Sequence, residues 1–249
     1  YQGTPTAGTG DLTDDSAIDL SIGDRTDCAL SFPGLIDDVR IYNRALSADE
    51  IKRLYKIGAT TKINTSISTG SLSSGLVGHW TFDGKDTIAN TAYDKSGQGN
   101  NGTLTNGPVR TQGKIGQGLE FDSNLRRVAV SPNSSINNLT TLTYSAWIYP
   151  TRSASDIGAI VGKANCGSGH LFTYEYPNTT DAFNFVGSKT TTLPRADSVD
   201  NIIKKNEWQH VVATWVDGQI PRLYRNGSEV QYQGTPTAGT GDLTDDSAI

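Results

Sequence analysis

The feature that most constrains this chain is a duplication of its two ends. Residues 1–18 read YQGTPTAGTGDLTDDSAI, and residues 232–249 repeat these eighteen letters without a change. The copies begin 231 residues apart, a period far longer than the roughly 20–50 residues of solenoid repeats. Each period is therefore expected to be a whole domain, and the chain to sample a tandem array of such domains. An overlap added to a single domain is the alternative that the sequence leaves open.

From residue 76 onward, short segments of alternating apolar and polar residues follow one another, separated by turns rich in Gly and Asn. Strands of this length and spacing, without helical patterns between them, predict a sandwich of antiparallel sheets. Asp217-Gly218 and Asn226-Gly227 are dipeptides that hairpin turns prefer, because these residues tolerate positive φ.

The segment LVGHWTF at residues 76–82 alternates as a strand does, which places Val77 and His79 on the face opposite to Trp80. In SFPGLIDDVRIY, the side chains that can face a core are Ile36, Val39 and Ile41.

One helix is expected, over residues 47–57. Ser47 and Glu50 form a capping box, an apolar stripe follows, and Gly58 suits the end of the helix. Residues 57–73 are polar and rich in Ser and Thr, which is typical of a linker.

The elements therefore appear in permuted order. We expect residues 1–56 to be the C-terminal part of one repeat, residues 57–73 to be the linker, and residues 74–249 to be the N-terminal and central part of the next repeat. Residues 1–56 could fold back onto 74–249 or complete a neighbouring molecule by strand exchange, and the sequence does not choose between these outcomes.

Composition narrows the possible partners and the compartment. A net charge of −5 without a basic stripe argues against nucleic acid as a partner, and no apolar run is long enough for membrane insertion of this segment. Cys28 and Cys166 make one pair per period, which favours a disulfide in an exported protein, with two unpaired thiols as the alternative. A targeting segment is expected upstream of this chain.

Acceptor motifs for N-glycosylation are more frequent than chance alone would give, which suggests glycosylation. The six Asn residues of these motifs are Asn64, Asn101, Asn133, Asn138, Asn178 and Asn226.

An ordered set of segments carries a resemblance to a known family. The segments are GLVGHWTFDG, YDKSGQGNNGTLTNG, GKIGQGLEFD, TYSAWIYP, EWQHVVATWVDGQIPRLYRNG and LSIGDRTDCALSFPGLIDDVRIYNRALSADEIKRLY. Read in the order 74–249 and then 19–56, the chain resembles the laminin-G-like, concanavalin-A-like domains of prokaryotic surface proteins. The resemblance implies an all-β, antiparallel jelly-roll sandwich with one short C-terminal helix. It also implies an extracellular domain that binds glycans or proteins, or serves as a spacer, and that is not usually an enzyme.

A structural calcium ion is the leading site hypothesis. The loop of residues 94–102 offers side-chain oxygens, including those of Asp94 and Asn100, on a backbone that Gly can bend tightly. The resemblance implies that Asp37 and Asp38 lie near the same ion. The alternative is a plain turn beside two acidic residues at a strand end.

Tyr174 and Tyr176 alternate along one strand and are the candidate platform for a sugar ligand, with packing inside the sandwich as the alternative. A retaining glycoside hydrolase needs two carboxyl groups about 5 Å apart. Glu120 and Asp122 come closest to such a motif, but Leu125 stands where the third acidic residue belongs, so the motif fails.

No other catalytic or metal-binding signature stands out. The three histidines, His79, His170 and His210, are too far apart in sequence for metal-ligand spacing, and sheet packing is expected for His79 and His210. The preferred function is a non-catalytic structural and adhesive repeat unit of an exported cell-surface protein or extracellular filament. Its expected partners are neighbouring identical repeats or subunits. The alternative is a carbohydrate-binding module in a tandem array that takes glycans, and a glycoside hydrolase is a distant third.

Overall fold

The computed structural model of the chain describes residues 15–25, 30–59, 72–121, 125–153, 157–165, 169–175, 180–187 and 192–240. Within these residues it contains eighteen strands and one helix. Residues 15–59 and 72–240 share the same two sheets, so the first part of the chain folds back onto the second.

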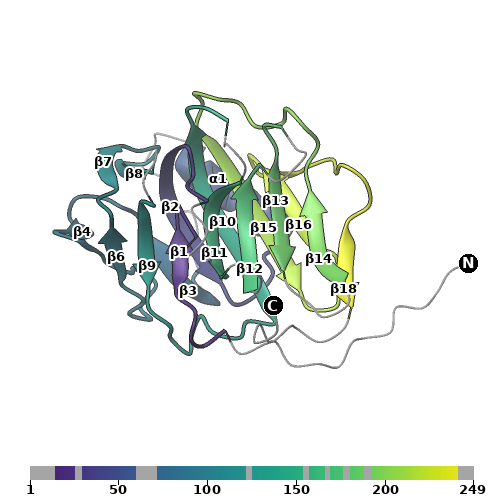
Figure 1. Cartoon of the computed structure of the whole chain (residues 1–249), viewed down its shortest axis with the longest axis horizontal. Coiled ribbons are helices and arrows are strands. Elements are labelled where there is room, and N and C mark those ends of the chain that lie inside the picture. The colour runs from purple at the N-terminus through teal and green to yellow at the C-terminus, as the bar shows by residue number, and fades with distance from the viewer. Residues whose placement is uncertain are drawn as a thin grey trace, which may run out of the picture.

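The larger sheet, here called sheet A, has ten strands in the described part of the chain, in the order β18-β14-β13-β12-β11-β1-β9-β6-β5-β4. In Figure 1, β1 lies between β9 and β11. Its strands are β1 Leu20–Ile22, β4 Thr87–Ile88, β5 Thr91–Ala92, β6 Gly102–Thr105, β9 Arg127–Val130, β11 Gly158–Ala164, β12 Gly169–Tyr174, β13 Phe183–Gly187, β14 Thr192–Asp197 and β18 Thr237–Thr240.

The second sheet, sheet B, has eight strands among the described residues and runs β17-β16-β15-β10-β2-β8-β7, with β3 paired to β2. Its strands are β2 Gly34–Tyr42, β3 Leu76–Trp80, β7 Val109–Gln112, β8 Gln117–Glu120, β10 Thr141–Pro150, β15 Gln209–Val216, β16 Arg222–Arg225 and β17 Ser228–Glu229. All the paired strands are antiparallel, which confirms the predicted antiparallel sandwich.

The main core fills the space between the two sheets. Ile36, Val39 and Ile41 of β2 are buried in it, which confirms the expectation for this strand. Burial of each such side chain stabilises the fold by about 1.5–3 kcal/mol. Because β1 and β2 are interior strands of sheets A and B, residues 15–59 supply the middle of the sandwich.

The expected alternation in β3 is wrong at one position. Val77 lies in the main core together with Trp80, while Leu76 packs under the helix. The register between β2 and β3 shifts between Ile41 and Tyr42, so β3 has one extra residue there. Such a bulge moves the following side chains to the other face of the sheet, and strict alternation does not anticipate it.

Helix α1, Ala48–Ala59, covers the outer face of sheet B and begins as the capping box predicts. The Glu50 amide donates to Ser47 Oγ at 3.3 Å, and the Ser47 amide donates to Glu50 Oε2 at 2.9 Å. Ile51 and Leu54 face a second core between the helix and the sheet. No helix in the described part of the chain has the length and apolar character needed to cross a membrane.

Two turns need the backbone freedom that their residues provide. Asn226 and Gly227 both have positive φ, 51° and 80°, and they close the predicted two-residue hairpin between β16 and β17. Gly23, at the end of β1, has φ +87°, and a Cβ there would lie 2.0 Å from the Phe121 ring. Only glycine therefore lets β1 turn away over the core at this point.

Candidate functional site

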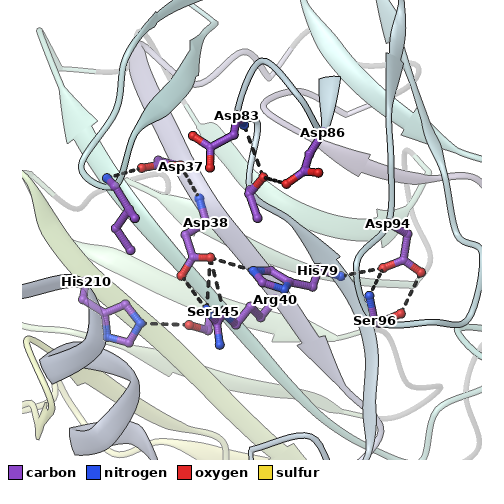
Figure 2. A network of polar contacts seen from close by, with 12 residues as sticks. Asp37, Asp38, Arg40, His79, Asp83, Asp86, Asp94, Ser96, Ser145 and His210 are labelled. Atoms are coloured by element: carbon purple, nitrogen blue, oxygen red, sulfur yellow. Dashed lines mark hydrogen bonds and ion pairs between the residues drawn. The ribbon is translucent and has the colours of Figure 1, made fainter. Parts of the chain in front are cut away.

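A network of charged and polar side chains follows β2 and β3 along the outer face of sheet B (Figure 2). It begins at a bulge in β2, where the register with β10 shifts between Ser145 and Trp147. Asp38 occupies the bulge with φ +46°. Its carboxylate lies 2.7 Å from His79 Nε2 and 3.2 Å from Arg40 Nη2. Burial disfavours the charged form, but Arg40 and His79 outweigh it and hold the pKa of Asp38 well below its usual range.

Asp37, the preceding residue, is fully buried. Its Oδ1 accepts the Asp38 amide at 2.7 Å, and its Oδ2 accepts the Ile115 amide at 2.8 Å. Burial raises the pKa of Asp37 to about 8, although the Ile115 amide opposes this shift. This carboxyl group ties the loop before β8 to β2.

Asp94 organises the loop that the sequence marks as a calcium candidate. Its Oδ1 accepts the backbone amides of Ser96 and His79, at 2.8 and 2.9 Å. Its Oδ2 accepts the Ser96 hydroxyl at 2.6 Å and the Asn100 amide at 3.0 Å. The Asn100 side chain donates to Val77 O at 2.6 Å. The loop is therefore held to β3 by hydrogen bonds of its own residues.

The four predicted calcium ligands lie around β3, with His79 between Asp38 and Asp94 (Figure 2). The fold brings the two segments near each other, as the hypothesis requires. The carboxylates, however, face different partners, and among the residues that the structure describes no group of three His, Cys, Asp or Glu side chains is arranged to hold a metal ion. Calcium binding stays a prediction.

Ser145 and His210 form a buried pair next to this network, with 2.9 Å between Ser145 Oγ and His210 Nε2. The exposed fractions of the two residues are 1% and 2%, so the hydroxyl is shielded from a substrate in solution. His210 packs against Trp147, at 5.3 Å between ring centroids, and against Tyr55 of α1. This confirms sheet packing for His210. His79 instead pairs with Asp38.

A second buried polar cluster lies on sheet A, and the sequence reasoning missed it. Lys163 of β11 is fully buried, and its ammonium lies 2.6 Å from Asp15 O and 3.6 Å from Asp15 Oδ1. His170 Nδ1 lies 2.7 Å from the hydroxyl of Tyr144, which reaches across from sheet B. Burial and the charge of Lys163 lower the pKa of His170 to about 4. The one available signal was a lysine inside the apolar strand GAIVGKA.

The expectation of an exposed sugar platform at Tyr174 is wrong. The ring is fully buried, packs edge-on against Phe32 at 5.8 Å, and its hydroxyl donates to Asp181 Oδ1 at 2.5 Å. Inward packing against the first part of the chain removes this ring from solvent. Tyr176 lies outside the described residues.

The predicted disulfide partners Cys28 and Cys166 also lie outside the described residues, as do Asn64 and Asn178. The other four Asn residues in acceptor motifs all accept hydrogen bonds through their side-chain oxygens, while glycosylation stays a prediction for all six. Asn133 accepts from the Ser135 amide, Asn138 from the Asp15 amide and Asn226 from the His210 amide. Asn101, which is exposed in its loop, accepts from the Asp94 amide at 2.9 Å.

A groove of about 320 Å³ lies between the start of α1 and the β15–β16 connection. Ile220 lines it with 45% of its surface exposed, and Arg222 and Glu229 line it as an ion pair at 3.1 Å. A ligand that has both apolar and polar surface can bind where an apolar side chain lies beside charged groups.

Because His210 is buried, we expect the folded protein to lose stability in acid. Burial lowers the pKa of His210 to about 3, so the folded state keeps it neutral in a range where the unfolded chain, with a pKa near 6.5, binds a proton. Between these values the free energy of unfolding should rise with pH. We expect His210→Phe, which keeps an aromatic ring, to show a shallower rise in urea titrations followed by Trp fluorescence. Asp37, whose raised pKa has the opposite effect, is present in both proteins and cancels from their difference. Equal slopes for both proteins would contradict this assignment.

Comparison with known proteins identifies one family. A family model described as the concanavalin A-like lectin/glucanases superfamily, of the laminin G type, matches residues 2–52 and 122–248. Searches of curated proteins and of solved structures find no match. The matched residues include β1 and β2 as well as β9 to β18, so they reach into both sheets.

Proposed function

Because this chain belongs to the concanavalin A-like lectin/glucanase superfamily, we propose that it is a structural and adhesive repeat unit of an exported cell-surface protein or extracellular filament. The observation that carries the proposal is the fit of residues 15–59 into the sandwich of residues 72–240. One period of 231 residues therefore supplies the strands of one sandwich. Repetition of such a period gives a row of identical domains.

Repetition is also the physical reason for adhesion. Identical domains on one chain place many weak sites together, and avidity then rises steeply with their number. Laminin-G-like domains are commonly extracellular, and the proposed location is the cell surface.

The proposal is tested by comparing this chain with a longer one that carries three periods of 231 residues. Small-angle scattering should show a maximum dimension that grows in nearly equal steps with each period. Retention on a surface coated with extracellular glycans and proteins should grow more steeply than the number of periods. A three-period chain that collapses into one compact body would contradict the array.

A non-catalytic role is part of this proposal. The superfamily includes glucanases as well as lectins, so fold alone does not decide the point. The non-catalytic role is supported by the failed carboxylate motif around Glu120 and by the burial of the Ser145–His210 pair. Turnover of a glucan by the purified chain would overturn it.

Carbohydrate binding is the second candidate, and the groove beside α1 favours it. In a glycan-array experiment, Arg222→Ala and Ile220→Ser should each weaken any signal at least several-fold. Ile88→Ser is the matched control, because Ile88 is an exposed apolar residue, at 56%, on the far edge strand β4 of sheet A. Equal signals for all three variants would assign the binding to another surface.

A further inference from the structure

Three asparagines of this chain are followed directly by glycine, and the fold places the three pairs in different surroundings. The pairs are Asn101-Gly102, Asn106-Gly107 and Asn226-Gly227. An asparagine side chain can react with the backbone amide of the next residue, and glycine has no Cβ to shield that amide. All three pairs are therefore chemically competent, and the surroundings decide which of them reacts in the folded chain.

Two of the pairs are held by the fold. Gly102 is buried in β6, which is paired on both sides inside sheet A. Asn226 Oδ1 accepts the His210 amide at 3.0 Å, and the Asn226 amide donates to His210 O at 2.8 Å. A Cβ on Gly227 would lie 3.2 Å from Lys52 Cα, so α1 covers this glycine. At both pairs the fold has to open locally before the side chain can reach the amide.

The Asn106-Gly107 pair is open by comparison. It lies in the turn that carries the chain from β6 of sheet A to β7 of sheet B. Both residues are exposed, with φ of 58° and 65°. Among the described residues no hydrogen-bond acceptor lies against the Gly107 amide, and a Cβ built on Gly107 would meet no atom within 4 Å. Pro108 follows, so Asn106 is outside the acceptor motifs for glycans.

A hydrogen bond from Asn106 Nδ2 to Leu125 O, at 2.9 Å, ties this turn to the residues before β9. β9 is also the strand that pairs with β6. The bond needs the side-chain amide, because an ionised carboxylate has no hydrogen to donate. Conversion of the amide to an acid therefore replaces this hydrogen bond with repulsion between two oxygen atoms.

We propose that Asn106 is a self-modification site, at which the folded chain converts this asparagine to aspartate and isoaspartate without an enzyme. The Gly107 amide nitrogen attacks Asn106 Cγ, an N–Cγ bond forms, the Cγ–Nδ2 bond breaks, and ammonia leaves with the amide proton. One water molecule then opens the cyclic imide. Attack of the water on Cγ gives aspartate, and attack on the main-chain carbonyl gives isoaspartate. No oxidant or reductant takes part.

Both products loosen the connection between the two sheets. Aspartate places a carboxylate beside Leu125 O, and isoaspartate adds a methylene group to the backbone of the turn. The inference does not depend on the proposed function, because it uses only the contacts of the turn and the chemistry of the amide.

Peptide mapping by mass spectrometry tests the proposal on the folded full chain in mildly alkaline buffer. Asn106 should convert first, and Asn101 and Asn226 at least about tenfold more slowly, because their surroundings have to open. Asn206 is the internal control: it is exposed with φ 59°, but Glu207 follows it in place of glycine, so it should stay intact. Conversion of Asn101 or Asn226 as fast as that of Asn106 would overturn the proposal.

The same mapping in urea separates the fold from the local sequence. In the unfolded chain all three pairs should convert at similar rates. If the preference for Asn106 persists there, it comes from neighbouring residues, and selection by the fold is overturned.

Two variants complete the test. Asn106→Gln, whose longer side chain closes the ring far more slowly, should remove most of the isoaspartate that an isoaspartyl methyltransferase detects in the folded chain. An undiminished signal would contradict the assignment to Asn106. Asn106→Asp, which is one of the products, should lower the melting temperature by about 2 °C through the lost hydrogen bond to Leu125. An unchanged melting temperature would overturn the proposed loosening.

Discussion

A chain shortened to residues 60–249 will lose cooperative unfolding, while the full chain will keep it. The shortened chain lacks β1, which joins β11 to β9, and β2, which joins β10 to β8 and pairs with β3. Without them sheet A separates into two pieces, and sheet B separates into two pieces and an unpaired β3. The buried side chains of Ile36, Val39 and Ile41 are also missing from the core. Urea titrations followed by Trp fluorescence and by far-UV circular dichroism measure this loss.

The matched control is a full chain with a protease site inserted after Ile63 and cleaved after folding. Its two fragments should stay associated through size-exclusion chromatography, because the contacts of β1, β2 and α1 are retained. A shortened chain that unfolds with the midpoint of the full chain would contradict the structural role of residues 15–59.

Lys163→Met is expected to lower the free energy of unfolding by about 3–5 kcal/mol, the usual effect of removing one partner of a buried ion pair. Met has nearly the shape of Lys, so the loss comes from the charge and not from a cavity. In the variant, the buried Asp15 carboxylate and the carbonyl oxygens of Asp15 and Ile18 lose the Lys163 ammonium group as a partner. Chemical denaturation at neutral pH measures the effect.

The control for this variant is Lys205→Met. Lys205 also pairs with a carboxylate, at 2.9 Å from Asp181, but its side chain is 36% exposed. Exposed pairs of this kind contribute about 0–1 kcal/mol, so the control should stay close to the unchanged protein. Equal effects of the two substitutions would show that burial of Lys163 does not matter.

Local patterns predicted much of the fold. The Ser47–Glu50 capping box predicted the start of α1, and Asn226-Gly227 predicted its hairpin. These features depend on residues a few positions apart, which the sequence displays directly. The place of Val77 was missed because the bulge in β3 exists only in the pairing with β2.

The sites were harder to predict than the fold. The family resemblance implied that Asp38 and Asp94 lie near a common centre, and the structure does bring them to either side of His79. It did not reveal that each carboxylate already has protein partners there. Tyr174 was a candidate for an exposed sugar platform, but its ring is buried against Phe32. Alternation along a strand does not show which face of the strand another segment covers.

The sequence by itself determined the family, the antiparallel strands, the single helix and the duplication, because periodicity, turn residues and repeats are properties of neighbouring or identical letters. Only the tertiary structure decided that residues 15–59 enter the middle of both sheets and that Lys163 finds Asp15 across 148 positions. The reason is that strand register joins distant segments, and the burial that selects one pairing is a property of the assembled core.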